Sequence, residues 1–352
     1  MSFQTFSLHQ LGWRAEYAQQ LTLADFEAGY PARVAAVHRS GLAVLSSRGH
    51  GTVVLPHQLA DAHTGVAVGD WVLVEHDADR VCCVLDRRSL VERVAAGGDH
   101  QRQSIAANLD VLFVVSSCND DFNPSRLERY LTLALDAGVT PVIVLTKADI
   151  GEGVAGYVAQ AEQLMFGVPV LAVNALDDAS VAQLEPWLAP GKTVAFVGSS
   201  GVGKSTLTNR VIGEVSQLTS GIREDDARGR HTTTAREMFS TVSGAWVIDT
   251  PGMRELRLAT AEPELETVFA DVVAFASQCR FRDCHHDGDA GCAVEAAVAE
   301  GALDARRLAN YRKLLREALR AQQSLREQRE QSRQFGAMAK QVMRAKRDRL
   351  GR

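Results

Sequence analysis

The chain lacks any long apolar run. Its 352 residues contain no uninterrupted hydrophobic stretch of the about 18 to 20 residues that a membrane-spanning helix needs. The N-terminal region also lacks the apolar centre of a secretory signal peptide and carries Gln4, His9, Gln10 and Arg14. Internal repeats and low-complexity tracts are not evident. We therefore expect a cytoplasmic protein with no membrane partner, and a hydrophobic content of 46% in a chain this long predicts two or three domains.

Cysteine is scarce, and half of it is clustered. The pattern Cys-x4-Cys-x-His-x5-Cys is formed by Cys279, Cys284, His286 and Cys292. Three sulfurs and one nitrogen in so short a segment suit a closed, tetrahedral site, so we expect one structural Zn²⁺ per chain. The adjacent His285 is an alternative ligand, and reduced, unliganded thiols are the alternative to a metal site. We expect core thiols in apolar strands at Cys82, Cys83 and Cys118.

A phosphate-binding pattern occupies residues 198–205. Its glycines allow backbone N–H groups to surround a phosphate, Lys204 can reach the β- and γ-phosphates, and the Ser205 hydroxyl can ligate Mg²⁺. The apolar run 193–197 predicts a buried strand before the loop, and a helix from Ser205 would point its N-terminus at the phosphates. A plain strand-to-helix turn is the alternative. The expected nucleotide contacts are Gly198, Ser199, Ser200, Gly201, Val202, Gly203, Lys204, Ser205 and Thr206.

An acidic turn follows another apolar run. Residues 245–248 predict a buried strand, and Asp249 stands at its end, where a carboxylate can hold Mg²⁺ through water. Gly252, in the same Asp-Thr-Pro-Gly sequence, is placed to meet the γ-phosphate with its N–H. The same four residues also make a good turn, and the phosphate-binding pattern upstream favours the functional interpretation.

A guanine-binding motif, Thr-Lys-Ala-Asp, closes the strand-like run 141–145. The carboxylate of Asp149 can accept both N–H groups of guanine's N1/N2 edge, which adenine lacks. The aliphatic stem of Lys147 can cover the base. Many GTPases have Asn where this chain has Thr146, so one side-chain hydrogen bond is weaker or rearranged.

The order of these motifs is unusual. The guanine motif, which ordinarily comes last, precedes both the phosphate-binding loop and Asp249. Asn174 and Ala175, which follow the strand-like run 169–173, are expected to meet a base carbonyl with a backbone N–H. If the two ends of this segment are considered joined, the set of GTPase motifs is complete. The sequence therefore predicts a circularly permuted P-loop GTPase domain over residues 96–260 that binds GTP with Mg²⁺.

A long polar loop between the phosphate-binding loop and Asp249 is expected to be an ordering switch. Within it, Thr233 or Thr232 is expected to complete the Mg²⁺ shell. Many GTPases carry a water-orienting glutamine where this chain has Met253, and methionine cannot orient water. His231 is the nearest polar candidate for a catalytic role, together with Lys204 and Thr233; a solvated or structural histidine is the alternative.

The N-terminal region reads as a small barrel over residues 31–95, after an extension of unclear role at residues 1–30. The expected short strands lie at 33–37, 41–45, 51–55, 71–74 and 80–85. Five strands in so short a region favour an OB-fold, which commonly contacts oligonucleotides. A compact scaffold without an RNA role is the alternative.

Basic residues are concentrated at the C-terminal end. Residues 305–352 hold 15 Lys and Arg against 4 acids, a net charge of +11, so the remainder carries −16. A docking helix is predicted by the spacing of Leu308, Tyr311, Leu314, Leu315 and Leu319. We expect residues 261–352 to form a zinc-binding helical module with a basic tail that contacts RNA phosphates; a solvated helix with a frayed tail is the alternative.

Taken together, these residues resemble one family, the circularly permuted GTPase RsgA, also called YjeQ. The resemblance covers roughly residues 30–300 and includes the sequence at 105–110. It implies a multidomain α/β protein with an N-terminal OB-fold and a C-terminal zinc module. It also implies that the small ribosomal subunit and its rRNA are the partners, that the subunit stimulates GTP hydrolysis, and that the protein acts late in subunit maturation. We expect a monomer, and the basic tail after about Gln322 is a local departure.

Two other functions share parts of the pattern. A kinase or ATPase would keep the phosphate-binding loop, but the carboxylate of Asp149 would face the acceptor N1 of adenine and repel it. A non-hydrolysing RNA-binding regulator would keep the barrel, the zinc ligands and the tail and use GTP only as a signal. Turnover measured with and without small subunits separates these functions.

Overall fold

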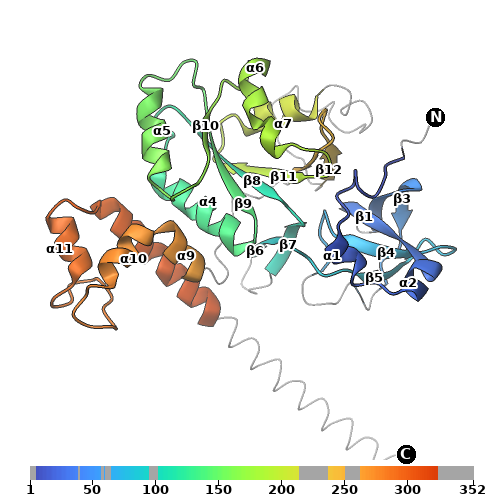
Figure 1. Cartoon of the computed structure of the whole chain (residues 1–352), viewed down its shortest axis with the longest axis horizontal. Helices are drawn as coiled ribbons and strands as arrows, with labels where there is room; N and C mark the ends of the chain where they lie inside the picture. The colour runs from blue at the N-terminus through green and yellow to red at the C-terminus, as the bar shows by residue number, and fades with distance from the viewer. Residues whose placement is uncertain are drawn as a thin grey trace, which may run out of the picture. The chain divides into compact units, whose positions relative to one another are not determined.

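The structure is a computed structural model, and it describes residues 5–38, 40–56, 59, 65–94, 102–213, 237–249 and 262–323. The chain divides into two compact units, and both are drawn in Figure 1. The larger unit comprises Met1–Arg257 and Thr267–Ala270, and the smaller comprises Leu258–Glu266 and Asp271–Arg352.

The larger unit is built on a parallel sheet that includes the predicted apolar runs at 141–145, 169–173, 193–197 and 245–248. In spatial order they are β10 (Val170–Ala172), β9 (Thr140–Thr146), β8 (Val111–Ser117), β11 (Thr193–Gly198) and β13 (Trp246–Asp249). The antiparallel strand β12 (Glu237–Ser240) pairs with β13. Near-continuous apolar runs are typical of parallel strands that are covered on both faces. The carboxyl ends of the five parallel strands meet at one edge of the sheet.

Helices cover both faces of this sheet (Figure 1). One face packs against α6 (Asp178–Val181), the 3-10 helix η1 (Ala182–Trp187) and α7 (Lys204–Ile212), in a core that includes stacked rings of Phe113 and Phe196. Contacts to β8, β9 and β10 are made by α4 (Pro124–Asp136) and α5 (Val154–Glu162). Because side chains alternate along a strand, these two helices use the residues that point away from the first core.

A second set of strands lies N-terminal to this sheet. They are β1 (Gly29–His38), β2 (Gly41–Ser46), β3 (Gly49–Val53), β4 (Trp71–Glu75) and β5 (Val81–Val84). Their order is β3-β2-β1-β4-β5, and a bridge between Val54 and Arg80 joins the two outer ends. Each strand overlaps a predicted one, although β3 begins and ends two residues earlier than predicted. The prediction of core thiols was wrong for Cys82, which is exposed because it faces outward next to the buried Val81 of β5. Cys83 is only partly buried, and Cys118 is buried as predicted.

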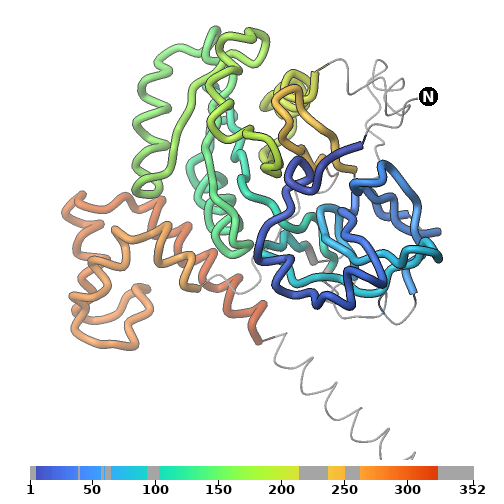
Figure 2. The backbone as a smooth tube through the Cα atoms, turned by 45° about the vertical axis from the view of Figure 1, so that its right-hand side comes forward, coloured from blue at the N-terminus to red at the C-terminus, as the bar shows by residue number. Residues whose placement is uncertain are grey.

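The N-terminal extension packs into the larger unit. It contains α1 (Ala15–Ala18) and α2 (Leu23–Ala28), and the side chains of Leu11 and Tyr17 are fully buried. The indole N–H of Trp246 donates to the carbonyl of Gln10 at 2.7 Å. In Figure 2 the dark blue extension can be followed from the sheet region to the barrel. The sequence left the role of this segment open, and the structure shows that it contributes to the core.

The barrel and the parallel sheet are joined through a buried arginine. The Arg33 side chain is 1% exposed and donates to the carbonyl of Leu11 and the hydroxyl of Thr193, each at 2.6 Å. Thr193 opens the strand that leads to the phosphate-binding loop. In the described part of the chain, a bridge between Ala36 of β1 and Glu237 of β12 also links the two sets of strands. A hairpin of β6 (Leu90–Val94) and β7 (Arg102–Ala107) completes the described strands.

The smaller unit is helical. Its described elements include residues of α9 (Glu262–Val268) and α10 (Ala270–Ala276), α11 (Ala293–Ala299) and a helix over residues 305–323. Arg307 of the last helix pairs with Asp271 of α10 at 2.6 Å. Leu308, Tyr311 and Leu314 are buried as predicted, whereas Leu319 is exposed and Ala318 takes its place. Within the described ranges, none of the helices has the length and apolar character needed to cross a bilayer.

Candidate nucleotide and metal sites

The phosphate-binding loop connects β11 to α7. Gly198 approaches β8 so closely that a Cβ on it would lie 2.2 Å from the Val115 carbonyl oxygen. Gly201 and Gly203 adopt left-handed φ angles of +80° and +89°, which favour glycine. The ammonium of Lys204 donates to the carbonyl of Ser199 inside the loop. The sequence-predicted residues of this motif therefore form one turn at the carboxyl end of β11, with its backbone wrapped ahead of the helix.

The guanine motif is joined to this loop by Thr146. Its side chain is fully buried, and its hydroxyl lies 2.5 Å from the carbonyl oxygen of Val202 and 3.1 Å from that of Ser116. Val202 belongs to the phosphate-binding loop, 56 residues further along the chain. Thr146 thus makes a side-chain hydrogen bond to the phosphate-binding loop itself.

Lys147 and Asp149 form the turn that follows. Lys147 has a left-handed φ of +59°, and its carbonyl accepts hydrogen bonds from Ile150 and Gly151. A left-handed φ is uncommon for a residue other than glycine and is found where the surroundings hold the backbone. Asp149 is exposed at the carboxyl edge of the sheet, where its carboxylate is open to a ligand.

Asn174 and Ala175 follow β10 at the same edge. The Asn174 N–H donates to the Ser180 hydroxyl at 2.9 Å, and the Asn174 side-chain oxygen accepts from the Leu176 N–H at 2.9 Å. Among the described residues, the Ala175 amide between them has no hydrogen-bond partner. These bonds hold the loop in shape without using the Ala175 N–H.

One residue that supports this site was missed from the sequence. Arg210 of α7 pairs with Asp178 at 2.8 Å and donates to the Leu176 carbonyl at 3.1 Å. It thereby ties the helix of the phosphate-binding loop to the loop that carries Ala175. No local sequence signal marks an arginine for this contact, because its partners lie more than thirty residues away.

Asp249, which was predicted to hold Mg²⁺ through water, ends β13. This strand is parallel to β11, and the predicted direct ligand Ser205 follows β11 by way of the phosphate-binding loop. Both side chains are exposed at this edge, and carboxylate and hydroxyl oxygens are ligands that suit Mg²⁺. The remaining predicted residues lie outside the described part of the chain: His231, Thr232, Thr233, Gly252 and Met253.

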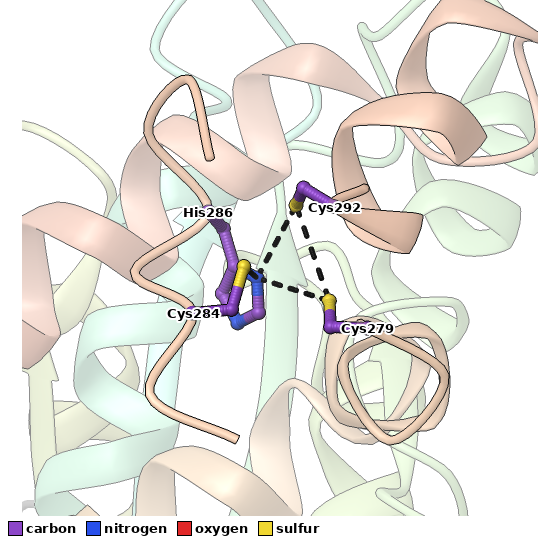
Figure 3. A group of neighbouring side chains, drawn as sticks. All are labelled: Cys279, Cys284, His286 and Cys292. Carbon is purple, nitrogen blue, oxygen red and sulfur yellow. Dashed lines mark hydrogen bonds between the residues drawn. The ribbon is translucent and has the colours of Figure 1, made fainter. Parts of the chain in front are cut away.

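The four metal-ligand candidates of the smaller unit converge on one point (Figure 3). The Nδ1 atom of His286 lies 3.6, 3.4 and 3.5 Å from the sulfurs of Cys279, Cys284 and Cys292, and the Cys279 and Cys292 sulfurs are 4.0 Å apart. Ligands at ordinary zinc bond lengths and tetrahedral angles are separated by about 3.6 Å for sulfur to nitrogen and about 3.8 Å for sulfur to sulfur. The residues fit a zinc ion, and the alternative ligand His285 is exposed and outside the cluster.

The protonation of these groups also suits a metal. Burial, helped by the nearby Arg312, lowers the pKa of His286, so its imidazole is neutral near pH 7 and can offer a lone pair. Burial and the adjacent thiols raise the pKa of Cys284 to about 12. A coordinated cation has the opposite effect, because it stabilises the thiolate. Arg312 holds the loop by pairing with Glu295 at 3.0 Å and Asp287 at 3.3 Å.

Comparison with known proteins agrees with this geometry. A family model described as RsgA GTPase matches residues 84–259. A Vibrio vulnificus protein named small ribosomal subunit biogenesis GTPase RsgA 2 is 49% identical over 341 residues, covering 97% of this chain and 96% of the relative. A Mesorhizobium japonicum protein named small ribosomal subunit biogenesis GTPase RsgA is 47% identical over 312 residues, covering 88% and 89%.

Two solved structures share the fold. The crystal structure of YjeQ from Thermotoga maritima matches with a TM-score of 0.61 and 25% identity, covering 83% of this chain and 99% of that chain. The structure of YloQ, titled a circularly permuted GTPase, matches with a TM-score of 0.58 and 24% identity, covering 82% and 95%. The chain therefore belongs to the RsgA GTPase family and is a GTP-hydrolysing enzyme.

Proposed function

We propose that this GTPase acts in biogenesis of the small ribosomal subunit and that the subunit stimulates its turnover. The names of the relatives support a role in small-subunit biogenesis. The main support for the nucleotide assignment is the hydrogen bond from the buried Thr146 hydroxyl to the Val202 carbonyl. That bond joins the guanine motif to the phosphate-binding loop, although the two stand in reversed order along the chain.

In this proposal each part of the site has a separate task. Lys204 leaves the Ser199 carbonyl to bind the β- and γ-phosphates, and the loop amides surround them. Asp149 accepts from the guanine N1/N2 edge, Lys147 covers the base, and the Ala175 N–H meets the base carbonyl. Mg²⁺, when bound, would neutralise phosphate charge, with Ser205 and Asp249 at its site.

The proposal extends to the other modules. We infer that the barrel is an OB-fold, which the closed strand order β3-β2-β1-β4-β5 supports, and that it and the basic tail contact rRNA. The Cys3His cluster would hold one structural zinc ion, which fixes a loop too short to pack alone. We further propose a cytoplasmic monomer that exchanges GTP and GDP on the subunit.

The test is nucleotide turnover with purified ribosomal subunits. The full-length protein is assayed with GTP and with ATP, alone and with small or large subunits at equal concentration. We expect slow GTP hydrolysis alone, a marked increase with small subunits only, and negligible ATP hydrolysis. Equal use of ATP, or no response to small subunits, would overturn the proposal.

A further inference from the structure

An arginine outside the known nucleotide motifs reaches the phosphate-binding loop. Arg126 lies in the first turn of α4, which begins after the Asn123 cap. The strand before this helix, β8, pairs in parallel with β11, and its Val115 is opposite Gly198 at the start of the loop. This pairing places the beginning of α4 beside the loop, and the Arg126 guanidinium donates to the Ser199 hydroxyl.

Two cations thus meet at one residue of the loop. The Lys204 ammonium binds the carbonyl of Ser199, and the Arg126 guanidinium binds its hydroxyl. Lys204 is the residue whose charge this motif aims at the β- and γ-phosphates. A second positive charge on the same loop residue raises the positive potential where those phosphates bind.

Within the ranges that the structure describes, the Arg126 guanidinium pairs with no acid. Among the described residues, the recorded side-chain partner of its guanidinium is a neutral hydroxyl, whereas Arg210 pairs with Asp178. A guanidinium gains more from an anionic oxygen than from a hydroxyl, because charge-assisted hydrogen bonds are roughly twice as strong and a planar fork suits phosphate. The exposed side chain is able to exchange one acceptor for the other.

We propose that Arg126 is a phosphate-binding residue of the GTP site. When GTP occupies the loop, its guanidinium leaves the Ser199 hydroxyl and binds an oxygen of the terminal phosphate. There it stabilises the negative charge of the phosphoryl group as water attacks, as arginines supplied to other GTPase sites do. Since GDP lacks the terminal phosphate, the residue favours the GTP state. The inference rests on the proposed nucleotide assignment of the loop.

The test compares two nucleotide states in one variant. Affinities of full-length wild type and Arg126→Gln are measured for GDP and for the non-hydrolysable analogue guanosine β,γ-imidotriphosphate, with Mg²⁺, together with GTP turnover. We expect Arg126→Gln to lose about tenfold or more in affinity for the analogue, to change less than about threefold for GDP, and to lose turnover. Arg126→Lys, which keeps the charge without the fork, should be intermediate.

The control variant is Arg80→Gln, which removes an exposed arginine of the barrel that pairs with Glu75 and should leave both affinities unchanged. Equal losses for the analogue and GDP in Arg126→Gln would mean that the arginine only shapes the loop, and no loss for either would mean that it plays no part; both results overturn the proposal. If wild type itself fails to bind guanine nucleotides, the nucleotide assignment fails instead.

Discussion

Arg33 is predicted to be the main polar attachment between the barrel and the GTPase sheet. Its replacement by alanine leaves the Leu11 carbonyl and the Thr193 hydroxyl without their donor. The third acceptor, the Gly69 carbonyl, keeps a bond from the Asn108 side chain at 3.0 Å. The energetic cost therefore falls on two buried acceptors rather than three.

The expected change in the free energy of unfolding on Arg33→Ala is the sum of opposing contributions. Each orphaned acceptor costs about 1–3 kcal/mol, and the two lost methylenes cost about 1.6 kcal/mol. Against this, burial lowers the pKa of Arg33 to about 10, so removing the buried charge regains about 3 kcal/mol. We expect Arg33→Ala to lower the free energy of unfolding by about 3 kcal/mol, and Arg33→Met, which refills the space of the stem, by about 1 kcal/mol.

Tryptophan fluorescence during denaturant unfolding measures this effect at the attachment itself. The Arg33 guanidinium lies 5.7 Å from the Trp71 ring, and the Trp13 ring lies 4.8 Å from that of Trp71. An Arg33→Ala variant within about 0.5 kcal/mol of wild type would show that these buried hydrogen bonds do not stabilise the attachment. A methionine variant as unstable as the alanine variant would contradict the expected gain from refilling the space, since the difference between them depends only on filling.

Two further predictions concern the bound groups. Cys284→Ser should reduce zinc from about one ion per chain to a small fraction, measured by elemental analysis, and should make the smaller unit more sensitive to proteolysis, because zinc binding contributes folding energy to this loop. The control is Cys82→Ser, at an exposed thiol. Full zinc in Cys284→Ser would mean that the ligands are other residues. Thr146→Val should lower the free energy of unfolding in denaturant by about 1–2 kcal/mol and weaken GTP binding, because it leaves the Val202 carbonyl without its donor. Thr140→Val, at the exposed start of the same strand, should do neither. Equal behaviour of the two variants would contradict the role of the Thr146 hydrogen bond.

Features encoded in short stretches of sequence were predictable. The parallel strands appear as apolar runs, and the left-handed turns of the phosphate-binding loop appear as glycines. The metal-ligand candidates appear as a spacing pattern. In the structure His286 lies with the three cysteines, and its neighbour His285 does not. Each of these signals depends on residues that are neighbours in sequence.

Features that depend on distant partners were not predictable. Arg33 stands in a strand pattern where a charged residue would be expected to face solvent, yet it is buried because Leu11 and Thr193 supply acceptors from both sides. The bond from Trp246 to Gln10 spans 236 residues, and no local pattern announces it. The acceptor of the Thr146 hydroxyl, the Val202 carbonyl, could likewise be identified only once the loop was placed beside it.

The most direct test of the guanine assignment is a change of base specificity at Asp149. In Asp149→Asn the new amide can donate to the O2 carbonyl of xanthine and still accept from its N1–H, whereas guanine presents a second donor there. We predict that the variant binds GTP about tenfold to a hundredfold more weakly than wild type and prefers xanthosine triphosphate over GTP in competition binding. Unchanged GTP affinity with no gain for xanthosine triphosphate would contradict the assignment of residues 146–149 as the guanine-reading element of this fold.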